Sequence, residues 1–204
     1  MILDVNRIAQ YKAELRAQAE AARRGLADRL TLSRRITDRL AELPEYRQAR
    51  VVMFYVNLPH EADTQHFLPA AWSAGKQVVV PFMAEGAIHL FRLQAMEELA
   101  AGHFHVLEPR AELRALAGRQ VDPAAIDLAV IPGVAFDRRG GRIGHGKGYY
   151  DLFLKRIRHD TPRVALAFEC QMLDEVPMLP HDVRMDKVVT DQGVYERSHA
   201  EEHP

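Results

Sequence analysis

The stretch from residue 126 to residue 157 constrains the fold of this chain more than any other. It begins with a short apolar run, Ile126 to Ile131, which predicts a buried β-strand. A glycine-rich segment follows, and six of the twelve glycines of the chain lie between Gly133 and Gly148. From Tyr149 to Ile157 the apolar residues recur with helical spacing. The order of strand, glycine-rich loop and helix predicts an α/β protein with an anion-binding loop.

The residue types in the loop favour a polyphosphate as the anion. Glycine allows backbone N–H groups to approach an anion closely, and the helix that follows adds unpaired N–H donors. Arg142, His145 and Lys147 place cationic or titratable side chains in the same segment. The glycine spacing matches neither the dinucleotide-binding pattern nor the P-loop. A glycine-rich surface loop with an incidental excess of charge is the alternative interpretation.

Strands alternate with helices along most of the chain, which predicts a three-layer α/β/α sandwich with a mostly parallel, Rossmann-like sheet. Glu85-Gly86, between two short apolar runs, predicts a small antiparallel hairpin over 82–93 at one edge of this sheet. The predicted buried strands are Val51–Val56, Gln77–Pro81, Ile126–Ile131 and Arg163–Phe168, with a last short strand within Asp182–Thr190.

Length and composition limit the class of protein. A chain of 204 residues fits a single domain, which we expect over residues 1–196, with a disordered charged tail over 197–204. A net charge of −1 gives no reason to expect nucleic acid or a membrane surface as a partner. The charged residues near the N-terminus lead us to expect no secretion signal, and no apolar run is long enough to span a bilayer. The sequence has a single cysteine, Cys170. We therefore expect a monomer in the cytoplasm.

Several charged side chains outside the loop are candidates for the same site. Lys12 and Arg16 share one face of an N-terminal helix and can reach one anion together, although a solvated helix edge is the alternative. Glu61 follows the first predicted strand, where open α/β sheets bind ligands, but it can also complement a helix dipole. Asp151 and Asp182 supply oxygen ligands for Mg²⁺ or serve as caps. His103 and His105 alternate in an extended segment and have no third ligand nearby, which disfavours a metal pair.

The whole string around the loop is more specific than its glycines. Pro132-Gly-Val-Ala-Phe-Asp137, followed by Gly-x-Arg142-Ile-Gly144-x-Gly146-x-Gly148-Tyr-Tyr-Asp151, resembles the signature of the 5-formyltetrahydrofolate cyclo-ligase family. The resemblance extends over nearly the whole chain, from Lys12 and Arg16 to Asp182 and Asp186, and implies one cyclo-ligase domain over residues 1–196. The fold of that family is a three-layer α/β sandwich.

The resemblance implies ATP and Mg²⁺ as cofactors and 5-formyltetrahydrofolate, with or without a polyglutamate tail, as substrate. It implies Lys147 and Tyr149 as catalytic residues, and Asp151 and Asp182 as magnesium ligands. The implied ATP-binding residues are Lys12, Arg16, Arg142, Gly144, His145, Gly146, Lys147, Gly148, Tyr149 and Tyr150. The implied folate-binding residues are Val56, Glu61, His145, Gly146, Lys147, Gly148 and Tyr149. The turn after the first strand, which contains Glu61 and Thr64, is implied to contribute to the folate pocket.

The implied reaction is an ATP-driven ring closure. The formyl oxygen takes the γ-phosphoryl group of ATP, N10 attacks the activated carbon, and 5,10-methenyltetrahydrofolate, ADP and phosphate result. Such a reaction needs positioning and charge neutralisation but no protein nucleophile.

One residue departs from the family pattern. Many relatives have arginine where this chain has His145, so a phosphate contact at this position is expected to be weaker and pH-dependent here. Two readings compete with the cyclo-ligase: a paralogue that acts on another substrate, and a nucleotide-binding regulatory protein without turnover. A nicotinamide-dependent dehydrogenase is disfavoured by the glycine spacing.

Overall fold

The computed structural model describes residues 5–102 and 106–198. His103, His105 and most of the predicted tail lie outside the described residues. Within the described part of the chain, no helix is both long enough and apolar enough to cross a membrane.

A seven-stranded sheet forms the centre of the molecule, in the order β12-β11-β9-β6-β1-β2-β3. The strands from β11 to β2 run parallel to one another, while β3 and β12 run antiparallel at the two edges. The mostly parallel sheet and the edge hairpin predicted from the sequence are therefore confirmed, but the second edge hairpin was not predicted. The strands are β1 (Val51–Phe54), β2 (Gln77–Ala84), β3 (Ala87–Arg92), β6 (Leu128–Ile131), β9 (Arg163–Leu166), β11 (Lys187–Val189) and β12 (Val194–Glu196).

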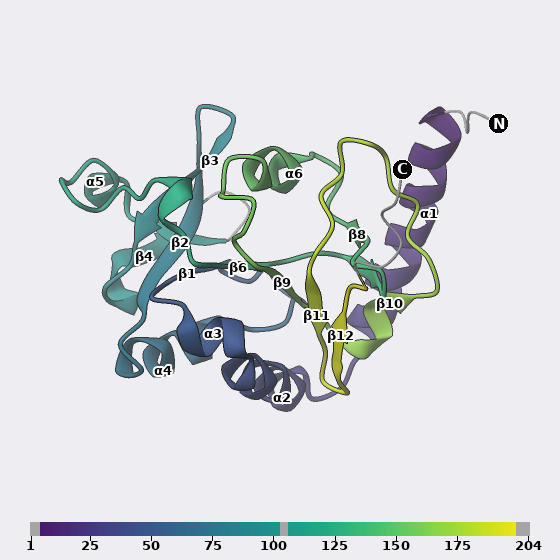
Figure 1. Ribbon diagram of the computed structural model, residues 1–204, viewed down its shortest axis with the longest axis horizontal. Helices are drawn as coiled ribbons and strands as arrows, with labels where there is room; N and C mark the ends of the chain where they lie inside the picture. The colour runs from purple at the N-terminus through teal and green to yellow at the C-terminus, as the bar shows by residue number, and fades with distance from the viewer. Residues whose placement is uncertain (1–4, 103–105, 199–204) are drawn as a thin grey trace.

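Helices cover both faces of this sheet, as Figure 1 shows. Alternate residues of β1 point to opposite faces, so Val52 and Phe54 belong to one hydrophobic core and Met53 to another. The first core is covered by α2 (Arg29–Glu42), α3 (Pro44–Gln48) and α4 (Leu68–Ser73), and the second by α6 (Tyr149–Leu154). This arrangement confirms the three-layer sandwich.

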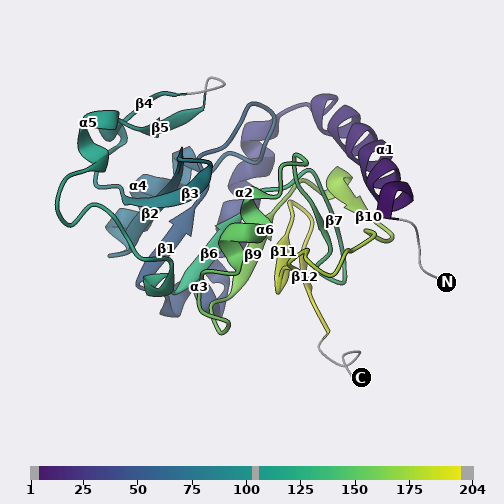
Figure 2. The same ribbon diagram turned by 90° about the horizontal axis from the view of Figure 1, so that it is seen from above.

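The N-terminal helix α1 (Val5–Arg24) lies beside a second, smaller sheet rather than on the central one (Figures 1 and 2). The small sheet consists of β7 (Ala135–Asp137), β8 (Arg142–Ile143) and β10 (Met172–Leu173). Leu15 and Ala19 of α1 pack against it in a third hydrophobic cluster. Residues 133–148 were expected to form one loop, but two strands, β7 and β8, lie within this segment.

Asp137 explains why the chain turns between β7 and β8. Its side chain is buried and accepts hydrogen bonds from the backbone N–H groups of Arg139 and Gly141, both at 2.8 Å, and of Val176 at 2.7 Å. These bonds close the turn and join it to the segment after β10. The glycine-rich loop is thereby shortened to residues 144–148.

The hairpin of β4 (Leu99–Ala101) and β5 (Leu107–Pro109) and helix α5 (Ala111–Arg114) follow β3 in the chain. The 3-10 helices are η1 (Gln65–Phe67), η2 (Met96–Glu98), η4 (Pro123–Ala125) and η5 (Glu169–Gln171).

The strand order determines where a ligand can bind. From β1 the chain moves to β2 on one side of the sheet, and from β6 it moves to β9 and β11 on the other side. Ligands of open α/β sheets bind at the carboxyl ends of the strands where this direction reverses. In this protein that point lies between the ends of β1 and β6, next to Tyr55 and Pro132.

Candidate active site

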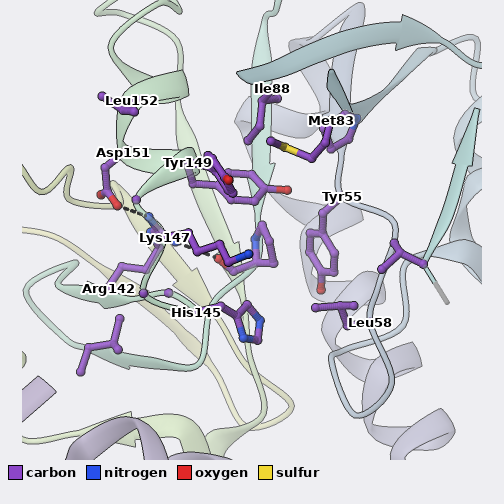
Figure 3. Close-up of a pocket in the computed structure, with 18 of the residues that line it drawn as sticks. Tyr55, Leu58, Met83, Ile88, Arg142, His145, Lys147, Tyr149, Asp151 and Leu152 are labelled. Atoms are coloured by element: carbon purple, nitrogen blue, oxygen red, sulfur yellow. Dashed lines mark hydrogen bonds and ion pairs between the residues drawn. The ribbon is translucent and has the colours of Figure 1, made fainter. Parts of the chain in front are cut away.

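A cavity of about 980 Å³ opens at this reversal point, and it has two walls of different chemistry. Figure 3 shows Tyr55, Leu58, Met83 and Ile88 facing the glycine-rich loop and the start of α6. Of the residues implied for ATP, folate or magnesium, all but Thr64 line this cavity: Lys12, Arg16, Val56, Glu61, Arg142, Gly144, His145, Gly146, Lys147, Gly148, Tyr149, Tyr150, Asp151 and Asp182. The structure thus brings together residues from both ends of the chain.

The glycine-rich loop over 144–148 forms the polar wall between β8 and α6. Gly146 and Gly148 have φ values of +93° and +68°, which side chains of L-residues rarely adopt, and Gly148 is the residue from which α6 begins. A β-carbon at Gly146 would lie 3.5 Å from the Arg16 guanidinium, which is an ordinary van der Waals contact, so the need for glycine comes from the backbone conformation. Glycine is therefore required for the path of this loop, which presents Lys147 toward the cavity in Figure 3.

Helix α1 contributes two cations to the polar wall. Lys12 forms an ion pair with Asp182, and both side chains are largely buried. Arg16 donates from Nε to the carbonyl oxygen of Gly144 at 2.8 Å. The predicted solvated helix edge is therefore not what the structure shows, because this face of α1 contacts the loop.

Arg142 lies behind the loop with its side chain only 3% exposed. Its Nη2 donates to Asp151 Oδ2 at 2.9 Å, and the guanidinium lies 5.7 Å from the centre of the Tyr150 ring. Burial raises the pKa of Tyr150, the negative charge of Glu61 adds to the rise, and Arg142 opposes it. The phenol is therefore neutral at physiological pH, and Arg142 contacts Asp151 from beneath the loop.

Glu61 connects the two walls. Its carboxylate is 4% exposed, accepts from the backbone N–H of Leu58 at 2.8 Å, and lies 3.1 Å from Nε2 of His145, which is 44% exposed. Burial, with the charge of Glu61 next, raises the pKa of Tyr55, whose hydroxyl donates to the carbonyl of Ala62. The alternative that Glu61 only complements a helix dipole is not supported, because its partners are a loop amide and His145.

The apolar wall was not predicted from the sequence. It comes from the β2–β3 hairpin and from β5, and includes Phe82, Met83, Ile88, Val106 and Leu107. Met83 and Ile88 are direct cross-strand partners in the hairpin, beside the two-residue turn at Glu85 and Gly86. The signal in the sequence was the apolar run that continues past Pro81, but only the tertiary fold turns this hairpin toward the glycine-rich loop.

Two residues named with the site lie elsewhere. Thr64 is fully buried and donates to the carbonyl of Tyr55 at 2.6 Å, so it supports the strand end and does not line the cavity. Asp186 accepts hydrogen bonds from the backbone and side chain of Arg163 and is also absent from the cavity lining. The expectation that His103 and His105 do not form a metal pair concerns residues outside the described ranges.

The donor set of the cavity is compatible with a magnesium ion that arrives with a phosphate ligand. Residues 5–102 and 106–198 contain no group of three or more His, Cys, Asp or Glu side chains placed to hold a metal. Magnesium, however, needs only one or two carboxylates when phosphate and water oxygens complete its shell. Asp151 and Asp182 are such carboxylates at the cavity edge, and each already has a cationic partner.

Comparison with known proteins identifies the relatives of this chain. The model of the 5-formyltetrahydrofolate cyclo-ligase family matches residues 8–191. The 5-formyltetrahydrofolate cyclo-ligase of Mus musculus is 28% identical over 190 residues, covering 87% of this chain and 92% of the mouse protein. That of Escherichia coli K12 is 29% identical over 162 residues, covering 78% of this chain and 87% of the relative.

Solved structures agree with this result. The 5,10-methenyltetrahydrofolate synthetase of Aquifex aeolicus superposes with a TM-score of 0.80 at 30% identity, over 94% of this chain and 99% of that protein. The synthetase of Mycoplasma pneumoniae superposes with a TM-score of 0.70 at 23% identity, over 88% of this chain and 98% of the other. The latter likeness supports the fold.

Proposed function

The chain belongs to the 5-formyltetrahydrofolate cyclo-ligase family, and from that premise we propose that it converts 5-formyltetrahydrofolate to 5,10-methenyltetrahydrofolate with consumption of ATP. The observation that supports this reaction best is the pairing of the two walls in one cavity. A glycine-rich wall with Lys12, Arg16 and Lys147 suits phosphates, while the apolar wall with Met83 and Ile88 suits the flat rings of a folate.

The phosphates of ATP bind the glycine-rich wall in this proposal. Lys12, Arg16 and Lys147 supply positive charge, and Gly144, Gly146 and Gly148 allow backbone N–H groups to approach the phosphate oxygens. His145, Tyr149 and Tyr150 complete the nucleotide side. Because the guanidinium of Arg142 is buried against Asp151, we assign Arg142 to positioning the loop and this carboxylate rather than to direct phosphate contact.

The folate lies between the loop and the hairpin. Val56 and Glu61 bind it from the end of β1, and His145, Gly146, Lys147, Gly148 and Tyr149 bind it from the loop. In this proposal the formyl oxygen of the folate lies next to the γ-phosphate of ATP, between the two walls. Lys147 and Tyr149 are the catalytic candidates, since both belong to the loop that would contact the two ligands at once.

Ring closure then needs two bond changes at the formyl group. The formyl oxygen attacks the γ-phosphorus and ADP leaves, and N10 next attacks the formyl carbon while the C–O bond to phosphate breaks. Lys147 neutralises charge on the transferred phosphoryl group. Asp151 and Asp182 would hold Mg²⁺, which would supply charge neutralisation for phosphoryl transfer.

The surroundings of the enzyme follow from composition. We propose a monomer in the cytoplasm, where the single cysteine fits a reducing compartment, and the near-zero net charge gives no reason to propose nucleic acid or a membrane as a partner. The folate can have one glutamate or several.

The test is the appearance of the methenyltetrahydrofolate absorbance band when protein, 5-formyltetrahydrofolate, Mg²⁺ and ATP are mixed. Samples without ATP, and samples with ADP in its place, are the controls. We expect an ATP-dependent rise with stoichiometric ADP formation. A flat trace from folded protein that binds ATP would overturn the proposed substrate and favour a paralogue with another substrate, or a nucleotide-binding regulatory protein.

A further inference from the structure

Arg114 lies behind the apolar wall of the cavity and contacts two of the residues that line it. It is the last residue of α5, and the adjacent Leu113 packs against the first hydrophobic core. The Cζ atom of Arg114 lies 4.9 Å from the centre of the Phe82 ring, and its Nη2 donates to Glu108 Oε2 at 3.1 Å. Phe82 and Glu108 line the cavity, whereas Arg114 does not.

These contacts join two hairpins that come from different sheets. Phe82 belongs to β2, which pairs with β3 at an edge of the central sheet, and Glu108 belongs to β5 of the two-stranded sheet. The Nε of Arg114 also donates at 2.8 Å to the carbonyl oxygen of Pro109, the last residue of β5. A two-stranded hairpin is only marginally stable by itself. The contacts of Arg114, together with the packing of Leu107 against the first core, therefore determine where β5 lies relative to β2.

A guanidinium group suits this position better than another cation would. Its planar fork lets Nε and Nη2 donate to a backbone carbonyl and a carboxylate, while its face contacts the Phe82 ring. A lysine can pair with Glu108 as a point charge but cannot make the three contacts together. The Glu108 side chain is 12% exposed, so covering it with a ligand ring would be costly if it had no cationic partner.

Gly102 leaves the space that the Glu108 side chain occupies. A β-carbon at Gly102 would lie 2.6 Å from Glu108 Oε2, which is the oxygen that accepts from Arg114. The backbone of Gly102 does not have a positive φ, so alanine causes no conformational strain there. Alanine at this position would therefore displace the Glu108 carboxylate from Arg114 while leaving Arg114 itself unchanged.

We propose that Arg114 is a positioning residue for the folate, because it fixes Phe82 and Glu108 in the wall against which the folate rings pack. This inference rests on the cyclo-ligase function proposed above. The cations assigned to ATP belong to α1 and the glycine-rich loop, whereas the side chain of Arg114 contacts β2 and β5. A change at Arg114 should therefore weaken folate binding and leave ATP binding unaffected.

The experiment measures the KM for 5-formyltetrahydrofolate, the KM for ATP and kcat for the wild type, Arg114→Met and Arg114→Lys. Arg114→Met keeps an unbranched side chain but removes the charge and both donors, and should raise the KM for folate about tenfold. Arg114→Lys keeps a cation beside Glu108 and should raise it about threefold. The KM for ATP should stay within about twofold of the wild-type value in both variants. Urea unfolding reports whether each variant folds.

Arg110→Met is the matched control. Arg110 is an exposed arginine just before α5 whose Nε donates to the carbonyl oxygen of Glu97 at 2.8 Å, and it does not line the cavity. Its replacement should leave both KM values unchanged, even where the free energy of unfolding falls. A structural effect common to arginines of this segment would appear in both variants, whereas the split between the two KM values should appear only in Arg114→Met.

Gly102→Ala tests the same wall without changing Arg114. Because it displaces the Glu108 carboxylate, we expect the KM for folate to rise about threefold with the KM for ATP unchanged. If Arg114→Met does not fold, Arg114→Lys and Gly102→Ala still decide the matter.

Two results would overturn the inference. Folded Arg114 variants with the wild-type KM for folate would make Arg114 a structural residue of the hairpin alone. Equal rises in the KM for folate and the KM for ATP would show a general disturbance of the cavity instead of a role in positioning the folate. Absence of ATP-dependent methenyl-folate formation by the wild type would overturn the proposed function, so the two failures are distinguishable.

Discussion

Lys147 is the side chain in the glycine-rich loop on which phosphate binding should depend most. Replacing it with alanine removes one positive charge beside the transferred phosphoryl group but no buried packing. We expect Lys147→Ala to lower kcat/KM for ATP by about 100-fold and to leave the free energy of unfolding nearly unchanged. Steady-state kinetics and urea unfolding measure the two effects, and Lys155→Ala, at the cavity rim on the same side, is the control. Unaltered kinetics would remove Lys147 from the mechanism.

Asp151 forms an ion pair with Arg142 and is also a proposed magnesium ligand, and a substitution can distinguish the two roles. Asp151→Asn removes half of the pair with the buried Arg142, and it also weakens a proposed magnesium ligand. We expect a higher Mg²⁺ concentration for half-maximal rate, together with a loss of roughly 1–3 kcal/mol in unfolding free energy, since a buried cation loses its charged partner. Rate against Mg²⁺ and urea unfolding without ligands measure these separately. A normal magnesium titration from a destabilised variant would leave Asp151 a purely structural role.

At the scale of the element, the turn between β7 and β8 depends on Gly140. It has a φ of +77°, and a β-carbon there would lie 2.1 Å from the backbone oxygen of Met185. We expect Gly140→Ala to cost about 3 kcal/mol or more, because backbone strain and a steric clash add together. Gly118 has the same φ with no atom within 4 Å of a built β-carbon, so Gly118→Ala should cost only about 1 kcal/mol.

The difference in unfolding free energy between these two alanine variants measures the cost of the clash between Gly140 in the small sheet and Met185 before β11. Equal decreases in unfolding free energy, measured with urea, would mean that the segment with Met185 moves away at little cost. A much larger loss for Gly140→Ala would support a rigid connection between the two sheets.

Over the whole molecule, partly buried ion pairs between distant segments should make stability depend on pH. Burial alone would raise the pKa of Glu98, but hydrogen bonds from Arg119 and the backbone outweigh it, and the pKa is lowered. Glu45 behaves in the same way with Lys187, which joins α3 to β11. A carboxyl group with a lowered pKa in the folded state stabilises fully above its unfolded pKa, and this contribution is lost as pH falls through the folded value.

We therefore expect the free energy of unfolding to fall as the pH is lowered from about 5, where the unfolded carboxyl groups begin to bind protons. Glu98→Gln should reduce stability at pH 7 by roughly 1.5–3 kcal/mol, the usual contribution of a hydrogen bond to a charged group, and should flatten the acid dependence. Glu97→Gln, at the exposed neighbouring position, should change neither. Urea unfolding across pH tests this, and parallel acid curves for wild type and Glu98→Gln would contradict it.

The local features of this protein could be predicted from its amino-acid sequence. Apolar runs and helical spacing indicated the buried strands and the helices, because these patterns depend on neighbouring residues. The strand, glycine-rich loop and helix over 126–157 indicated the region of the site, and the residues inferred for it by resemblance line one cavity, except Thr64 and Asp186. The turn at Glu85 and Gly86 was also predicted, since its backbone conformation depends on those two residues.

The contacts between distant segments could not be predicted from the sequence and were seen first in the folded structure. The antiparallel partner β12, the small sheet under α1 and the apolar wall with Met83 and Ile88 all depend on the path of the chain. The Glu61–His145 contact joins residues far apart in sequence, and Thr64 proved to be a support for the strand end. Such contacts arise from burial and hydrogen bonding between elements that are far apart in the sequence, so they cannot be deduced from the local spacing of residues.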